Sequence, residues 1–253
     1  MRPRSRSWSR VGLVSLLVLG VPASRAATDV VGLLARSQRA LEPGKDLQAT
    51  VTFEIGNAKG DSVSWTGSYY RRSGADVRTR IVFDTPLDLR GTEVALRSLP
   101  DGSEQVRTYL PAIRRIRDLS GDARGESFLG TDFNYEDLGL EHLAYREHAL
   151  LGEDRFDGRT CTDVESIPQQ GWWYGKIVRC VDMRTGLPIR TRYYDRSGTL
   201  WKVRTFNRIE TVDGHPTATR ITMETVPLGT WTRITFRDLK YDRGLPATVV
   251  ELP

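Results

Sequence analysis

The sequence predicts a mainly β protein, in which a curved antiparallel sheet forms an unclosed half β-barrel with an N-terminal helix and a short helical lid segment. Two observations carry this prediction. About a dozen short segments alternate apolar and polar residues, and tight-turn residues separate them, as in a meandering antiparallel sheet. A twisted sheet with so many strands rarely stays flat, so we expect it to curl.

Residues 28–44 contain the one long helix that the sequence predicts. In "TDVVGLLARSQRALEPG" the residues that share a face at helical spacing are Val30, Leu33, Leu34, Ser37 and Leu41. Thr28 or Asp29 can cap the start of this helix, and Gly44 follows its end.

The strands begin with "LQATVTFEIG", where Leu47 to Ile55 alternate strictly between apolar and polar side chains. The further predicted strands cover residues 62–71, 76–84, 92–98, 104–110, 112–117, 145–155, 159–167, 173–182, 188–195, 199–209, 217–226 and 231–239. Turn residues between them include Lys59-Gly60-Asp61, Asp101-Gly102, Asp157-Gly158, Thr185-Gly186, Ser197-Gly198, Asp213-Gly214 and Leu228-Gly229.

One irregular segment, residues 118–143, interrupts this rhythm. It contains "SFLGTDFNYEDL", residues 127–138, which we call the lid segment. We expect the lid segment and the N-terminal helix to cover the mouth of the curled sheet.

Residues 1–26 have the composition of a secretory signal peptide. Several arginines precede an apolar run that starts at Val11, and the small residues Ser24 and Ala26 follow it. The run is too short to span a bilayer, and no cysteine follows it that could be acylated. We expect cleavage after Ala26, which leaves residues 27–253 as one exported domain.

The net charge of +5 does not indicate nucleic-acid binding. The predicted signal peptide holds five arginines and no acidic residue, so the rest of the chain has 32 basic and 32 acidic residues. A neutral chain lacks the positive surface that contacts to a phosphate backbone require.

Cys161 and Cys180 are the only cysteines. In an oxidising compartment an even count favours a disulfide, and a turn centred on Gln170 and Gly171 would place the two residues opposite each other on paired strands. Two buried free thiols are the alternative. A metal site is less favoured, because no histidine or further cysteine lies at ligand spacing.

The sequence contains no motif for nucleophilic, zinc or dinucleotide chemistry. The histidines are His142, His148 and His215, and no G-x-S-x-G, G-x-G-x-x-G, P-loop, C-x-x-C or H-E-x-x-H sequence accompanies them. We therefore predict no catalytic residues, no metal and no cofactor.

The lid segment allows two interpretations. Asp132 and Glu136 would share a helical face, as a glycosidase-like carboxylate pair or a calcium site requires. The structural interpretation is favoured: Thr131 or Asp132 caps a short helix, apolar side chains turn inward, and Glu136 and Asp137 face water. The apolar candidates for lining a cavity are Tyr109, Leu110, Phe128, Leu129, Phe133, Tyr135 and Leu138.

The basic run "RRIRD" from Arg114 alternates with Ile113 and Ile116. It is more simply interpreted as the solvated outer face of a strand. Contact with a phosphate or an acidic headgroup is the alternative.

Two stretches, "FDTPLDLRGTEVAL" from Phe83 and "YLPAIRRIRDLSGDARGESFLGTDFNYEDL" from Tyr109, closely resemble the LolA-like family of outer-membrane lipoprotein-sorting proteins. "YGKIVRCVD", "GLPIRTRYYDRSGTLWKV" and "ITFRDLKYDRGLP" are similar to the closing strands of that family. The pair Cys161 and Cys180 is not part of the family pattern, and no motif places a cavity arginine.

The resemblance implies a periplasmic half-barrel that holds the acyl chains of a lipid or lipoprotein. It implies transfer without bond-making, from an inner-membrane transporter of the RND type to an outer-membrane acceptor, and we expect a monomer. The alternatives are an envelope scaffold without a cavity and a glycan-active enzyme that uses Asp132 and Glu136.

Overall fold

The computed structural model describes residues 29–252, except residues 102, 120, 140–145 and 169–171. The predicted signal peptide, residues 1–26, lies outside the described residues. Within the described part of the chain, no helix has the length and hydropathy that crossing a membrane would require.

The described chain forms one helix, thirteen strands and several short 3-10 turns. The helix is α1, Val30–Leu41, and the strands are β1 Asp46–Gly56, β2 Ser62–Ser73, β3 Val77–Thr85, β4 Glu93–Ser98, β5 Glu104–Leu110, β6 Arg115–Leu119, β7 Arg146–Phe156, β8 Arg159–Pro168, β9 Lys176–Asp182, β10 Pro188–Tyr194, β11 Leu200–Val212, β12 His215–Thr225 and β13 Thr230–Tyr241. The 3-10 turns are η1 Leu87–Leu89, η2 Gly121–Gly125, η3 Glu136–Leu138, η5 Val226–Leu228 and η6 Ala247–Val250.

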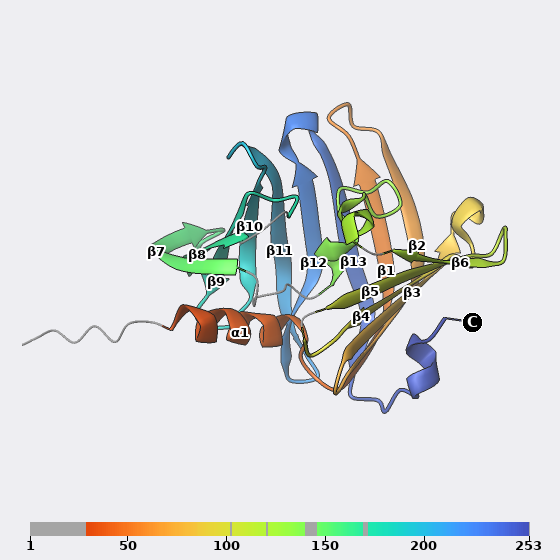
Figure 1. The fold of residues 1–253 in the computed structure, drawn as a ribbon. Helices are drawn as coiled ribbons and strands as arrows, with labels where there is room; N and C mark the ends of the chain where they lie inside the picture. Colours follow the sequence, from red (N-terminus) through yellow and green to blue (C-terminus); the bar gives the residue numbers. More distant parts are fainter. Residues whose placement is uncertain (1–28, 102, 120, 140–145, 169–171, 253) are drawn as a thin grey trace, which may run out of the picture.

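All thirteen strands belong to one antiparallel sheet, in the order β6-β5-β4-β3-β2-β1-β13-β12-β11-β10-β9-β8-β7. The first and last strands pair in the middle of the sheet, and β6 and β7 are its two edges. These edge strands are consecutive in the sequence, so the chain between them must cross the open side of the sheet. Figure 1 shows the lid segment there, in green. The predicted unclosed half-barrel is confirmed.

Local irregularities in the strand pairing contribute to the curvature of the sheet. Register shifts occur in five strand pairs, including β1 with β13 between Gln48 and Thr50. Such bulges increase the local twist and bend a strand. The concave face that results carries the main apolar core, which includes Val51, Phe53 and Ile234.

The helix α1 lies across one part of the concave face (Figure 1). Its residues Leu33 and Leu34 are buried against Val164 of β8 and Val181 of β9. The amphipathic pattern predicted from the sequence therefore gives the buried face of the helix.

The predicted strand boundaries mostly agree with the structure, and two differences matter. β6 begins at Arg115 instead of residue 112, because residues 110–114 form a turn in which Arg114 has a φ of +51°. β9 begins at Lys176 instead of residue 173, which leaves Trp173 and Tyr174 outside the strand.

A disulfide joins Cys161 of β8 to Cys180 of β9, with the two Cα atoms 5.3 Å apart. The predicted bridge is confirmed, but the register differs by two residues. Cys180 pairs with Asp163, and Cys161 pairs with Asp182, so the bridge is diagonal across the hairpin instead of direct.

We expect the double substitution Cys161→Ala and Cys180→Ala to lower the free energy of unfolding by about 3 kcal/mol. The reason is that the bridge closes a loop over a sequence separation of 19, and its loss raises the entropy of the unfolded chain. Urea unfolding of the oxidised wild type and of the variant measures this difference. Equal stability would show that the hairpin does not need the bridge.

Candidate functional site

The lid segment is a compact loop with its own hydrogen bonds. Ser127 and Asn134 form an isolated antiparallel bridge, and the Phe128 amide donates to the Phe133 carbonyl at 2.7 Å. The Ser127 hydroxyl donates to the Thr131 carbonyl at 2.6 Å. These bonds give the segment a defined shape before it contacts the sheet.

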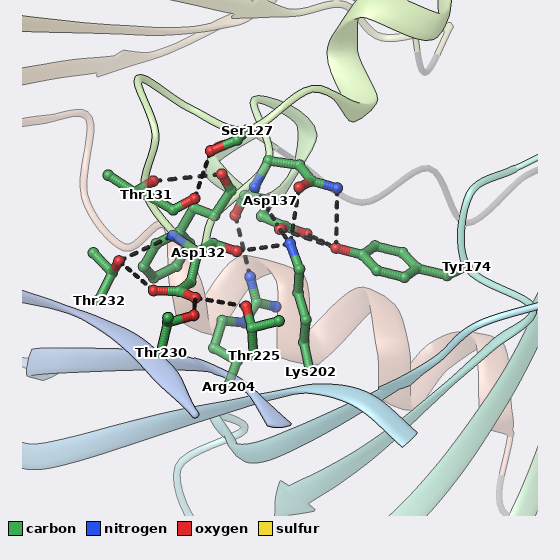
Figure 2. A network of polar contacts seen from close by, with 12 residues as sticks. Ser127, Thr131, Asp132, Asp137, Tyr174, Lys202, Arg204, Thr225, Thr230 and Thr232 are labelled. Atoms are coloured by element: carbon green, nitrogen blue, oxygen red, sulfur yellow. Dashed lines mark hydrogen bonds and ion pairs between the residues drawn. The ribbon is translucent and has the colours of Figure 1, made fainter. Parts of the chain in front are cut away.

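Asp132 fastens the lid segment to β12 and β13. Its side chain is buried, and its two carboxylate oxygens accept hydrogen bonds from Thr225 at 2.5 Å, Thr230 at 2.6 Å and Thr232 at 2.7 Å. Its amide also donates to the Thr232 hydroxyl oxygen at 2.9 Å. Figure 2 shows the three threonines converging on this one carboxylate.

Lys202 of β11 provides the second attachment. Its ammonium group donates to the Asp132 carbonyl at 2.7 Å and to Asn134 Oδ1 at 2.8 Å, and it lies 3.7 Å from the Asp137 carboxylate. Burial lowers the pKa of Lys202, and Asp137 and Asp132 act in the opposite direction. The buried cation is thus satisfied by acceptors of the lid segment.

Asp137 and Glu136 complete the attachment on the side of β9 to β11. The Tyr174 hydroxyl donates to the Asp137 carboxylate at 3.0 Å, and Arg204 Nη1 donates to the Asp137 carbonyl at 3.2 Å. Trp172 Nε1 donates to Glu136 Oε1 at 2.8 Å. Burial raises the pKa of Tyr174 well above its usual value, and the Asp137 carboxylate adds to this effect. Tyr174 is therefore a stable hydrogen-bond donor.

The expectation that Glu136 and Asp137 face water is wrong. Only 5% of Glu136 is exposed, and the Asp137 side chain is 3% exposed. The acids point toward the sheet because its inner face supplies Lys202 and several hydroxyl and N–H donors. We call Asp132, Asn134, Asp137, Tyr174, Lys202, Arg204, Thr225, Thr230 and Thr232 the anchor network.

The aromatic side of the lid segment fills one part of the concave face. The Phe128 ring lies 5.8 Å from Phe53, 6.2 Å from Phe83 and 5.3 Å from Tyr135, measured between centroids. Phe128, Phe133 and Tyr135 are all buried in the main core, and Leu129 and Leu138 pack against it. This part of the half-barrel is solidly packed.

A cavity remains between α1, the sheet and the lid segment, with a volume of about 180 Å³. Its apolar wall includes Leu34, Leu41, Leu47, Val51, Phe53, Ile81, Leu96, Phe133, Leu138, Phe206, Ile221, Ile234 and Phe236. Two of the predicted lining residues, Phe133 and Leu138, therefore border the cavity. Tyr109 and Leu110 lie at the end of β5 and do not belong to the described residues that line the cavity.

The cavity wall also contains buried charged groups that the sequence analysis missed. Arg71, Arg179 and Arg204 are 2%, 2% and 6% exposed, and Glu42 follows the end of α1. Arg71 donates to the Pro43 carbonyl. Strand alternation indicates that Arg71 and Arg204 face the interior. Arg71 is two residues from Tyr69, and Arg204 is two residues from Phe206, so each points to the same face of the sheet as an aromatic residue of the core.

Burial raises the pKa of Glu42 to about 7. The guanidinium of Arg71 acts against this shift, and the carboxylate of Glu104 adds to it. Near neutral pH the Glu42 carboxyl is therefore divided between its neutral and charged forms.

The contacts of Asp132 and Glu136 do not favour the carboxylate-pair hypothesis. Three threonine hydroxyls hold Asp132, whereas Glu136 accepts from Trp172 in another part of the fold. In the described part of the chain, the one cluster with metal-ligand geometry is Cys161, Asp163 and Cys180, and its two sulfurs are joined in the disulfide.

Comparisons with known proteins agree with this architecture. A family model described as "Uncharacterized protein" matches residues 75–252. A DUF1329 family protein of Desulfovibrio piger is 29% identical with a TM-score of 0.79, over 88% of this chain and 97% of that chain. An outer membrane lipoprotein-sorting protein domain of Vibrio parahaemolyticus is 25% identical with a TM-score of 0.80, over 86% and 94%. The chain belongs to the LolA-like family.

A third structure has the same LolA-like fold. It is a LolA superfamily protein of Nitrosomonas europaea, 17% identical with a TM-score of 0.68, over 88% of this chain and 97% of that chain. No curated protein matches the sequence. The family resemblance predicted from the two stretches that begin at Phe83 and Tyr109 is confirmed.

The anchor network predicts a large effect of Asp132→Asn. The neutral amide offers one oxygen where the carboxylate accepts three hydroxyls, so we expect a loss of about 3 kcal/mol in the free energy of unfolding. Hydrogen exchange of the amides of residues 127–138 should become faster. The matched control is Asp118→Asn, whose carboxylate is 70% exposed and should contribute less than about 1 kcal/mol. Unchanged exchange in Asp132→Asn would contradict the assigned role.

The raised pKa of Glu42 predicts a pH dependence of stability. The folded state binds the Glu42 proton more tightly than the unfolded chain, whose pKa is near 4.5. Stability should therefore fall as pH rises from about 4.5 to about 7 and should then level off. Glu42→Gln should reduce this slope, and the exposed control Glu153→Gln should keep it. Thermal unfolding measured across this pH range tests both variants.

Proposed function

We propose that this protein is a non-enzymatic periplasmic carrier that binds acyl chains of a lipid or lipoprotein and shuttles them between the inner and outer membranes. The observation that carries the proposal is an apolar cavity whose roof is held by polar anchors instead of being part of the sheet. The description of the Vibrio parahaemolyticus relative as a lipoprotein-sorting domain supports it.

The described conformation suits a carrier without cargo. A cavity of about 180 Å³ is on the order of the space that holds one benzene ring, and a sixteen-carbon acyl chain has more than twice as many carbon atoms. Phe133 of the lid segment borders the cavity, and Phe128 and Tyr135 pack with it in the adjoining core. We infer that cargo displaces these rings, which opens the packed part of the half-barrel.

The energies allow such an exchange. Transfer of an acyl chain from water gains about 0.8 kcal/mol per methylene, so sixteen carbons represent on the order of 12 kcal/mol. A bilayer offers the same chain a similar gain, so the carrier competes only through small differences. A lid segment that leaves its closed position, where the anchor network and its packed aromatic rings hold it, gives the cavity two states with different affinity, and this permits uptake and release.

We propose the following route for the cargo. Residues 1–26 direct export and are removed after Ala26, and the domain of residues 27–253 acts as a monomer in the periplasm. An RND-type transporter in the inner membrane delivers the lipid or lipoprotein, and an acceptor in the outer membrane receives it. The cargo crosses without any bond being made or broken, so the carboxylates of the lid segment serve attachment.

A cavity-filling variant tests the proposal. Ile221 lines the cavity on β12, and Thr222 follows it on the same strand with its side chain on the opposite face. We expect the wild type to bind a dansyl-labelled fatty acid and Ile221→Trp to bind it at least tenfold more weakly. Thr222→Trp should bind like the wild type, and both variants should unfold at similar temperatures.

Native mass spectrometry of protein purified from its own periplasm gives the complementary result. The expected result is a population with bound lipid, which Ile221→Trp reduces. Protein that is free of lipid and does not bind the labelled fatty acid would instead support an envelope scaffold.

A further inference from the structure

The turn between β5 and β6 and the first three residues of β6 expose isoleucines next to arginines. Ile113 is 60% exposed and Ile116 is 37% exposed, although large aliphatic side chains are usually buried. Arg114, Arg115 and Arg117 are also exposed, and residues 111–117 contain no acidic residue. We call residues 111–117 the basic turn.

The charges of the basic turn are only partly balanced. Arg117 lies 3.4 Å from Glu126. For Arg114 and Arg115, no carboxylate lies within 4.0 Å among the residues that the structure describes. Two guanidinium groups are therefore available to a partner outside the chain.

The connection between β3 and β4 extends this patch. Its turn η1 carries Leu87, which is 74% exposed, and it is followed by the exposed Arg90. A Cβ placed on Gly91 would lie 3.6 Å from Pro111 of the basic turn, so the two loops are adjacent. Figure 1 shows them close together at the same end of the sheet. The connection also carries the acids Asp84 and Asp88, and the excess of positive charge comes from the basic turn.

Protection of a sheet edge does not explain the whole patch. β6 is an edge strand, and charged residues on an edge discourage pairing with other chains. The exposed Ile116 on the same edge has the opposite effect, and the exposed Ile113 lies in the adjoining turn. The combination of exposed basic and exposed apolar side chains therefore indicates a binding surface.

The chemistry of the patch fits a lipid surface better than a protein. Arginine binds phosphate oxygens through paired N–H groups, and aliphatic side chains at loop tips can enter the boundary between headgroups and acyl chains. Protein interfaces usually depend on aromatic anchors and matching pockets. The exposed apolar residues of this patch, Leu87, Ile113 and Ile116, are all aliphatic.

We propose that the basic turn, together with Leu87 of η1, docks the protein on a membrane surface that is rich in anionic phospholipids. Arg114 and Arg115 bind lipid phosphates, and Ile113 and Leu87 enter the headgroup region. The chain runs from β6 directly into the segment that contains the lid, so docking places this segment close to the bilayer. The site extends the proposed carrier function, but membrane docking does not require cargo in the cavity.

Vesicle sedimentation tests the proposal. We expect the wild type to bind vesicles of phosphatidylglycerol and phosphatidylcholine, to bind pure phosphatidylcholine at least tenfold more weakly, and to lose binding as salt increases. Arg114→Asn with Arg115→Ser should weaken binding about tenfold or more, and asparagine tolerates the positive φ at position 114. Ile113→Ser with Leu87→Ser should weaken binding at every salt concentration.

The matched control is Met183→Ser with Arg184→Asn, which removes another exposed apolar and basic pair from a turn between β9 and β10. This control should bind vesicles like the wild type. The proposal is overturned if the basic-turn variants bind like the wild type or if neutral vesicles bind equally well. Crosslinking of the basic turn to a membrane protein in native membranes, without binding to protein-free vesicles, would also overturn it.

The two proposals can fail separately. Binding of the dansyl-labelled fatty acid reports on the cavity, and vesicle sedimentation reports on the basic turn. Loss of vesicle binding with normal binding of the fatty acid would identify a docking defect, and the reverse pattern would identify a cavity defect.

Discussion

The structure depends on a buried carboxylate that must be saturated with hydrogen bonds. An ionised aspartate costs several kcal/mol in a protein interior unless donors surround it. Asp132 finds these donors in Thr225, Thr230 and Thr232, and the first two are directly opposite each other across β12 and β13. The position of the lid segment is therefore tied to the register of two central strands. A shift of one residue would turn the threonines to the other face of the sheet.

One part of the concave face carries a packed core, and another part borders a cavity. Where the rings of Phe128 and Phe133 meet Phe53 and Phe83, the half-barrel has an ordinary packed core. Between α1 and the sheet the side chains do not fill the volume, and a cavity remains. The same lid segment borders both parts, so a movement that enlarges the cavity must unpack the core. This coupling suits a protein that has to bind cargo without holding it permanently.

The charged groups in the cavity wall limit how the shape of the cavity can change. Arg71, Arg179 and Arg204 lie among aliphatic and aromatic side chains, where an unpaired charge is unfavourable. Backbone carbonyls satisfy part of this requirement, as Pro43 does for Arg71 and Asp137 does for Arg204. The wall is therefore fixed by directional bonds as well as by packing, and its shape depends on the segments that supply the carbonyls.

The sequence by itself determined the helix, the strands, most turns, the disulfide and the family, because alternation, turn residues and cysteine spacing act between near neighbours in the chain. It did not determine the direction of the lid acids. Their polarity predicts that Glu136 and Asp137 face water, but their donors Trp172 and Tyr174 lie 36 and 37 residues away. Asp132 likewise finds its hydroxyl partners 93 to 100 residues away. Only the curvature of the sheet, which carries those partners beneath the crossing chain, decided that these acids are buried. The cavity likewise required the tertiary structure, because a volume is what side chains from many strands leave unfilled.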